Sequence, residues 1–308
     1  MPFYPFHLIG RETIIPIHGH QFSARLLRHD TVIPATFPLP IIVGYANKDV
    51  GKFDMVCNTF LQIGVSEADI TLGQISVNSV ISDETGEVLS GWDMNNDKIL
   101  LYDASGRNIG LYYNLPQAYI DIDPYLYEGS GAGWYPDNNF RKAECVNDYK
   151  LPNGTGILVK AADGKNAKLI FNGEVKQAPN DIDVGRFVIA GNSSPVEIKL
   201  GDITVNSVIS DETGEVLAGW DMNNDKILLY DADGRNIGLF YNLPQAYIDI
   251  DPYLYEGSVA GWYPDNNFRR AECMNNYPLP PGSAFLVKAA DGIQPVITIP
   301  SPIKTQNK

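Results

Sequence analysis

Short stretches of alternating apolar and polar residues recur along this chain and predict β-strands. Residues 75–81 alternate in this way, and the polar turn at 83–86 follows them. The apolar runs 98–102 and 109–113 are joined by residues 103–106, which is the pattern of a β-hairpin whose glycine adopts a positive φ. Strand signals return about every 8 to 12 residues without the alternating helices of an α/β protein. The sequence therefore predicts an all-β fold of the sandwich or barrel type.

The whole pattern occurs twice. Residues 91–103 return unchanged as residues 219–231, and a shift of 128 positions over residues 73–164 gives about 78 identities in 92. Upstream, residues 49–53 return more faintly as 183–187 at a shift of 134, because the first copy has a longer connection over residues 61–70. We expect that insertion to be a loop and the two copies to superpose closely outside it.

Four segments follow from this duplication. We predict two tandem, near-identical β-sandwich-like domains preceded by an extended N-terminal arm and followed by a polar tail. Residues 296–299 are expected to be the strand that closes the second domain, as residues 168–171 close the first. The predicted segments are an arm at 1–40, domains at 41–168 and 169–300, and the tail at 301–308.

The first 40 residues differ from everything after them. They hold all four histidines and carry a net charge of about +1, whereas the whole chain carries −14. Prolines at 16, 34, 38 and 40 keep the segment from forming a regular sheet of its own, although 13–15 and 31–33 can pair as strands. Its apolar side chains are costly to leave in water, so an arm that docks on a partner is favoured over a disordered tail. We expect that deleting residues 1–40 leaves two folded domains and abolishes assembly; the apolar residues of this assembly arm are Phe3, Phe6, Leu8, Ile9, Phe22, Leu26 and Leu27.

Composition excludes several classes of protein. Hydrophobic residues make up 44% of the chain, which is a globular composition. The net charge of −14 disfavours binding to nucleic acid or to an anionic membrane. The sequence shows no signal-peptide pattern and no apolar run of about 20 residues. Cys145 and Cys273 occupy the same position in the two copies, so each is expected as a buried thiol of its own domain rather than half of a bridge.

Several motifs recur in order in both copies: Asp-Val-Gly-Lys/Arg-Phe, Leu-Gly-Gln/Asp-Ile, Asp-Lys-Ile-Leu-Leu-Tyr-Asp, Gly-Trp-Tyr and Leu-Pro-x-Gly before an apolar strand. This order resembles uncharacterised tandem β-repeats of bacterial surface proteins and of phage structural proteins, over residues 41–300. The resemblance implies an extracellular or virion structural role and brings no catalytic residues. The lack of a signal-peptide pattern favours the virion.

Two sets of residues are candidates for calcium. Asp93, Asn95 and Asp97 have the spacing of a calcium loop, but Lys98 and Ala104 stand where an EF-hand needs Gly and Glu, so a polar turn is the alternative. The equivalent residues in the second copy are Asp221, Asn223 and Asp225. The other candidate set consists of loop carboxylates that either ligate calcium or face solvent: Asp121 and Asp123 in the first copy, and Asp249 and Asp251 in the second.

An aromatic set offers a different kind of site. These residues form either a sugar-stacking platform in each copy or part of each core: Trp92, Trp134, Tyr135, Trp220, Trp262 and Tyr263. Two equal sugar sites on one chain would gain avidity. His18 and His20 are too few to hold a metal alone, and neither repeat contains a histidine for nucleophilic catalysis.

These observations lead to one hypothesis and one alternative. The hypothesis is a non-enzymatic structural protein of a virion, such as a capsid decoration, head-fibre or tail-associated component, anchored by its arm and projecting two β-domains. Its partners would be other structural proteins of the same assembly, with possible self-association, and it would use no cofactor and no metal. The alternative is a bivalent carbohydrate-binding or adhesion module of a bacterial surface, which would bind glycans.

Overall fold

The computed structural model describes residues 13–17, 20–26, 42–63, 68–103, 106–151, 154–162, 164–231, 233–290 and 292–301. For residues 13–17, 20–26 and 42–44 it gives the backbone alone. The described chain is built almost wholly from β-strands in small antiparallel sheets, with the short helices α1 (Gln117–Ile122) and α2 (Gln245–Ile250). The predicted all-β class is confirmed.

The first repeat consists of two sheets around one core. One sheet contains β3 (Ile42–Asp49), β15 (Lys168–Val175), β5 (Phe60–Leu61) and β7 (Ile75–Val77). The other has the order β12 (Gly133–Tyr135), β11 (Asn108–Leu115), β10 (Lys98–Tyr102), β14 (Gly156–Lys160) and β4 (Asp54–Cys57). Alternate residues of β10 are buried, as a strand with one face on a core requires. Side chains of both sheets share the core, including Ile99, Ile157, Leu169 and Phe171.

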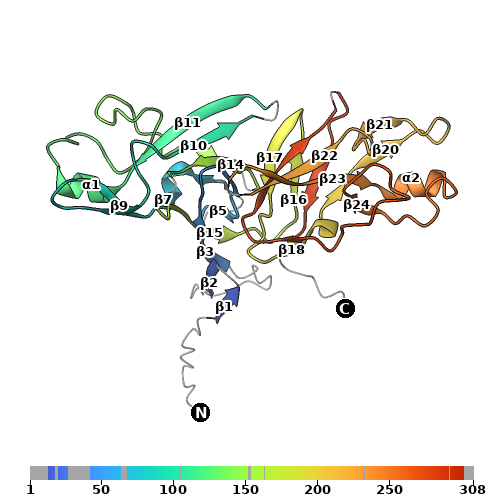
Figure 1. Ribbon diagram of the computed structural model, residues 1–308, viewed down its shortest axis with the longest axis horizontal. Helices are drawn as coiled ribbons and strands as arrows, with labels where there is room; N and C mark the ends of the chain where they lie inside the picture. The colour runs from blue at the N-terminus through green and yellow to red at the C-terminus, as the bar shows by residue number, and fades with distance from the viewer. Residues whose placement is uncertain are drawn as a thin grey trace, which may run out of the picture.

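Smaller elements extend this repeat. β6 (Ile70–Thr71) pairs with β13 (Lys150–Leu151), and β8 (Ser79–Ile81) pairs with β9 (Val88–Gly91). The 3-10 turn η1 (Leu72–Gln74) leads into β7. Helix α1 packs near β8 and lies at one end of the molecule (Figure 1).

The second repeat has the elements described so far in the same order, except that β5, at the start of the longer connection of the first repeat, has no counterpart. Its sheets are β16 (Asn180–Asp183), β27 (Val296–Ile299) and β19 (Thr204–Val205), and β17 (Phe187–Gly191), β26 (Ala284–Lys288), β22 (Lys226–Tyr230), β23 (Asn236–Leu243) and β24 (Gly261–Tyr263). The small elements are β18 (Ile198–Lys199), η2 (Leu200–Asp202), β20 (Ser207–Ile209), β21 (Val216–Gly219) and β25 (Pro278–Leu279). Helix α2 lies at the opposite end of the molecule from α1 (Figure 1).

Strand pairing shows where the chain passes from one repeat to the next. β15 pairs with β3, β5 and β7, which all precede it. The whole of Lys168–Val175 therefore belongs to the first sheet, whereas the sequence analysis places the boundary at residue 168. The passage lies at residues 176–179, before β16 begins.

Part of the N-terminal arm belongs to the first repeat. β1 (Thr13–Ile17) pairs with β2 (His20–Leu26), and β2 pairs with β3, so this hairpin extends the first sheet. Phe22 lies opposite Ala46, and Leu26 lies opposite Ile42. The sequence analysis expects the arm to dock on a partner, but residues 13–17 and 20–26 dock on the first repeat itself, because β3 offers them an edge. Thr13 to Ile15 form a strand as expected, but their partner is β2; Phe3, Phe6, Leu8, Ile9, Leu27 and the run 31–33 lie outside the described residues.

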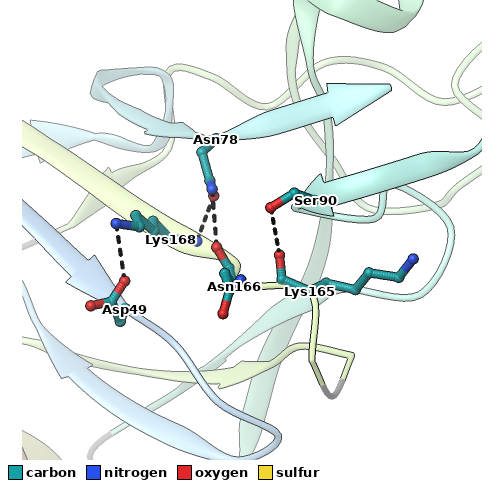
Figure 2. A network of polar contacts seen from close by, with 6 residues as sticks. All are labelled: Asp49, Asn78, Ser90, Lys165, Asn166 and Lys168. Atoms are coloured by element: carbon teal, nitrogen blue, oxygen red, sulfur yellow. Dashed lines mark hydrogen bonds and ion pairs between the residues drawn. The ribbon is translucent and has the colours of Figure 1, made fainter. Parts of the chain in front are cut away.

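A polar network fixes the β8–β9 hairpin to β15. The Asn78 side chain accepts a hydrogen bond from the backbone N–H of Lys168 at 2.6 Å and donates one to the carbonyl of Asn166 at 3.0 Å (Figure 2). Ser90 Oγ donates to the carbonyl of Lys165 at 3.2 Å, and the Lys168 ammonium lies 3.3 Å from the Asp49 carboxylate. In the second copy, Asn206 Oδ1 accepts from the N–H of Val296 at 2.6 Å. These contacts replace strand ladder bonds at the point where the chain leaves β7.

The three cysteines are free. Cys57 is buried, and burial raises the pKa of its thiol. Cys145 is exposed and Cys273 half-buried, so the expectation that both are buried is wrong. They lie after the Gly-Trp-Tyr strands, outside the helices and strands, and Cys273 packs against the edge of the cluster around Tyr263 and Phe268.

The two repeats meet through the edges β4 and β17, with β14 and β26 beside them near the middle of the molecule (Figure 1). Three short bridges cross this interface: Phe53 to Asp233, Val56 to Ser283 and Thr155 to Ala190. The last two join equivalent positions, because Ala190 is the counterpart of Val56 and Ser283 is the counterpart of Thr155. The repeats are therefore related by an approximate two-fold axis that passes between them.

Candidate functional site

The tryptophan set lies in the cores and offers no sugar platform. All four tryptophans are fully buried, and Tyr135 and Tyr263 are 2% exposed. Trp92 and Trp134 pack edge to face with centroids 5.6 Å apart, and Trp134 Nε1 donates to the carbonyl of Ile75 at 2.9 Å. Trp220 and Trp262 repeat this arrangement at 5.3 Å. A ring must be exposed to stack on a sugar, so these residues act as core, which was the other interpretation of their pattern.

The Asp93–Asp97 segment is a turn closed by its own hydrogen bonds. Asp93 Oδ1 accepts from the N–H of Asn95 at 2.9 Å, and Asp93 Oδ2 accepts from the Asn96 amide at 2.8 Å. Asp97 is fully buried and accepts from the N–H groups of Asp93 and Ala162 at 2.8 and 2.7 Å. Burial raises the pKa of Asp97 to about 6. Three of the four carboxylate oxygens of Asp93 and Asp97 thus accept backbone N–H groups and the fourth accepts the Asn96 amide, which favours the polar turn over a calcium site.

The second copy of this turn has the same bonds. Asp225 accepts from the N–H groups of Asp221 and Ala290, and burial raises its pKa to about 6. Asn223 donates its N–H to Asp221. Among the described residues no group of three or more His, Cys, Asp and Glu side chains is arranged to hold a metal.

The remaining carboxylate and histidine candidates are not brought together. Asp121 accepts from the Gln117 amide at 2.8 Å, and Asp123 caps the N–H of Leu126 at 2.8 Å. Asp249 and Asp251 make the same contacts in the second copy. His20 begins β2, and His18 lies outside the described residues.

The arrangement that the sequence analysis missed is a cavity between the repeats. It has a volume of about 380 Å³, which lies in the range of small-molecule sites. Each repeat supplies equivalent residues: Phe53 and Phe187, Met55 and Ile189, Tyr102 and Tyr230, Gly106 and Gly234, and Leu158 and Leu286, with Val188 in addition. The cavity is thus an apolar chamber on the approximate two-fold axis.

Two reciprocal contacts close the walls of this chamber. Phe187 packs against Gly106 of the first repeat, where a Cβ would lie 2.8 Å from the Phe187 Cβ. Phe53 packs in the same way against Gly234, where a Cβ would lie 2.9 Å from the Phe53 Cβ. Each phenylalanine therefore requires a glycine hairpin in the other repeat.

Cations lie on both phenylalanine rings. Lys160 Nζ is 4.6 Å from the Phe53 ring centroid, and Lys288 Nζ is 5.7 Å from that of Phe187. The guanidinium carbon of Arg186 lies 6.0 Å from the Phe187 centroid. Such cation–π contacts keep positive charge beside the apolar walls.

One sequence signal indicates that strands near the chamber have apolar residues on both faces. Ile157-Leu158-Val159 and Ile99-Leu100-Leu101 are unbroken apolar runs, whereas a strand with one face in water alternates. Val159 and Ile157 face the core of the first repeat, and Leu158 faces the chamber. The local sequence pattern shows that a strand has a second apolar face, but it does not show which surface of the other repeat covers that face.

Comparison with protein-family models, curated proteins and solved structures gives no match for this chain. None of the described helices has the length and apolar character needed to cross a membrane.

Proposed function

We propose that this protein is a non-enzymatic structural component of a virion, attached through its N-terminal segment and displaying the two repeats. The observation that carries this proposal is the hairpin β1–β2, which has no counterpart in the second repeat and adds itself to the edge of β3. Strand addition is a common means of attachment because the backbone supplies the bonds. Among the described strands, β1 has β2 as its single neighbour, so its outer edge faces away from the sheet.

Two equal surfaces at the ends of the molecule support a role in assembly. Next to α1, Tyr125 is 85% exposed and Leu126 is 49% exposed. Next to α2, Tyr253 is 85% exposed and Leu254 is 51% exposed. Large exposed apolar side chains that recur at both ends are typical of contact sites. The position of α1 and α2 lets each chain contact neighbours on two sides (Figure 1).

The test is incorporation into particles. A tagged full-length chain is produced in its host during phage growth, and particles are purified by density gradient. We expect the full-length chain to sediment with the particles and a chain lacking residues 1–40 to remain in the soluble fraction. A matched variant, Ser23→Pro, keeps every apolar residue of the arm but removes a ladder N–H of β2, and it should also be lost from particles.

Equal incorporation of all three chains would contradict the attachment through the hairpin. Recovery of the full-length chain on the bacterial envelope instead of in particles would contradict the virion role and favour the adhesion alternative.

A further inference from the structure

The chamber between the repeats is partly open to solvent, and its walls are almost wholly apolar. Water inside it is poorly held, since a well-bound water needs two to four polar partners. Covering such walls with an apolar ligand removes apolar surface from water, which is favourable. The lining residues that the structure describes include no charged side chain, and their polar groups are the hydroxyls of Tyr102 and Tyr230. An apolar occupant is therefore favoured over water.

The charged residues around the chamber indicate the charge of the ligand's polar group. The chain as a whole is strongly acidic, at −14, yet Lys160 and Lys288 lie on the two wall phenylalanines at equivalent positions, with Arg186 beside one of them. In the two neighbouring hairpins, Asp103 pairs with Arg107 at 3.0 Å and Asp233 with Arg235 at 3.6 Å, and Asp231 accepts the N–H groups of Asp233 and Arg235. An anionic group at the chamber edge would meet cations on either side of the two-fold axis.

The symmetry of the walls indicates a simple ligand. Four of the five equivalent pairs join identical residues, and the fifth pairs Met55 with Ile189. A wall that looks the same from both ends cannot select a complex asymmetric skeleton, but it accommodates a polymethylene chain in either direction. We propose that the chamber binds one long-chain aliphatic carboxylate, with its chain between the two repeats and its carboxylate beside Lys160 or Lys288.

The binding test uses dodecanoate and the full-length chain in isothermal titration calorimetry, with dodecanol as a ligand of the same length without the charge. We expect one saturable dodecanoate site per chain and dodecanol binding about tenfold weaker. Leu158→Trp fills the chamber and should reduce dodecanoate affinity at least about tenfold. Leu111→Trp is the matched control, because Leu111 faces the same side of that sheet two strands away and does not line the chamber.

The charge test uses the double variant Lys160→Gln and Lys288→Gln. It should weaken dodecanoate about tenfold and leave dodecanol unchanged, since the substitutions remove the cations and not the apolar walls. If Leu158→Trp does not fold, the equivalent substitution in the second repeat, Leu286→Trp, replaces it in the binding test.

Three results would overturn the proposal. One is the absence of saturable dodecanoate binding to the native chain, and another is equal affinity of folded Leu158→Trp and Leu111→Trp. The third is equal binding of dodecanoate and dodecanol, because it would show that the cations do not recognise the ligand. All of these measurements use the isolated chain, so they are independent of whether the protein enters a particle.

Discussion

Asp97 and Asp225 each join their own turn to a segment that is distant in the sequence. Each carboxylate accepts one N–H from its own turn and one from a residue 65 positions further along the chain. The spacing of Asp93, Asn95 and Asp97 marks an unusual loop, and the local part of its bonding is readable from Asx-turn chemistry. The bond from Ala162 is not readable, because it depends on how β14 packs beside β10.

We expect Asp97→Asn to destabilise the fold by about 1–3 kcal/mol, because the amide has one acceptor oxygen for two buried N–H donors. Asp225→Asn should cost a similar amount, since its bonds are the same. Urea unfolding at pH 7 measures both. Asp121→Asn, on an exposed carboxylate, is the control and should change the unfolding free energy by less than about 0.5 kcal/mol.

The same residues predict a pH dependence. Their pKa is about 6 in the folded state against 3.8 in the unfolded state, with burial as the main cause. The folded state therefore holds these protons more tightly, and the stability they contribute is fully present below pH 4 and is lost as pH rises through 6. Urea unfolding between pH 3.5 and about 7 should show this loss in the native chain and a flatter profile in the Asp97→Asn, Asp225→Asn double variant. An unchanged slope in the double variant would exclude these two groups as its source.

At the scale of elements, hairpins and core strands follow from local pattern, but strand partners do not. Residues 98–102 and 109–113 form the predicted hairpin as β10 and β11. Residues 13–15 form a strand, yet its sheet is that of β3, because β3 has an edge that β5 and β7 do not cover. The prolines of the arm prevent an independent sheet and allow an outer strand, and Pro16 does lie on the outermost strand β1.

Deleting residues 1–40 should lower the melting temperature by a few degrees without abolishing cooperative unfolding. The second repeat forms the three-stranded sheet β16-β27-β19 without any hairpin of this kind, so the repeat fold does not require one. Differential scanning calorimetry measures the effect, and Ser23→Pro should give a similar decrease. A truncated chain with no cooperative transition would show that β1–β2 is essential to the first repeat.

At the scale of the whole molecule, the two repeats share an extensive interface and are not merely joined by a linker. The interface combines backbone bridges, the reciprocal Phe–Gly contacts and a small apolar cluster around Cys57, Ile189 and Ala284. The duplicated sequence indicates two similar halves, but nearly identical halves can join in many ways. The two copies differ at this interface. Gly156 leaves room for Ile189 of the other repeat, whereas Ala284 stands at the position of the second copy that is equivalent to Gly156.

Gly106→Ala and Gly86→Ala separate the cost of backbone strain from the cost of the interface. Both glycines have positive φ, 78° and 68°, so either alanine strains the backbone by a similar amount. A Cβ on Gly86 meets no atom within 4 Å, whereas one on Gly106 strikes Phe187 of the other repeat. We expect Gly106→Ala to cost about 1–3 kcal/mol more than Gly86→Ala in urea unfolding. Gly234→Ala should match Gly106→Ala, and equal costs for positions 86 and 106 would contradict a tight reciprocal contact.

The reciprocal Phe–Gly contacts also limit how many repeats such a protein can have. Each repeat uses its own phenylalanine and its own glycine hairpin on the same neighbour, which makes the interface isologous and closes it at two copies. A third tandem copy would present the same phenylalanine and hairpin to surfaces that are already occupied. Growth of this architecture by further duplication is therefore expected to proceed in pairs, with the repeat pair and not the single repeat as the inherited unit.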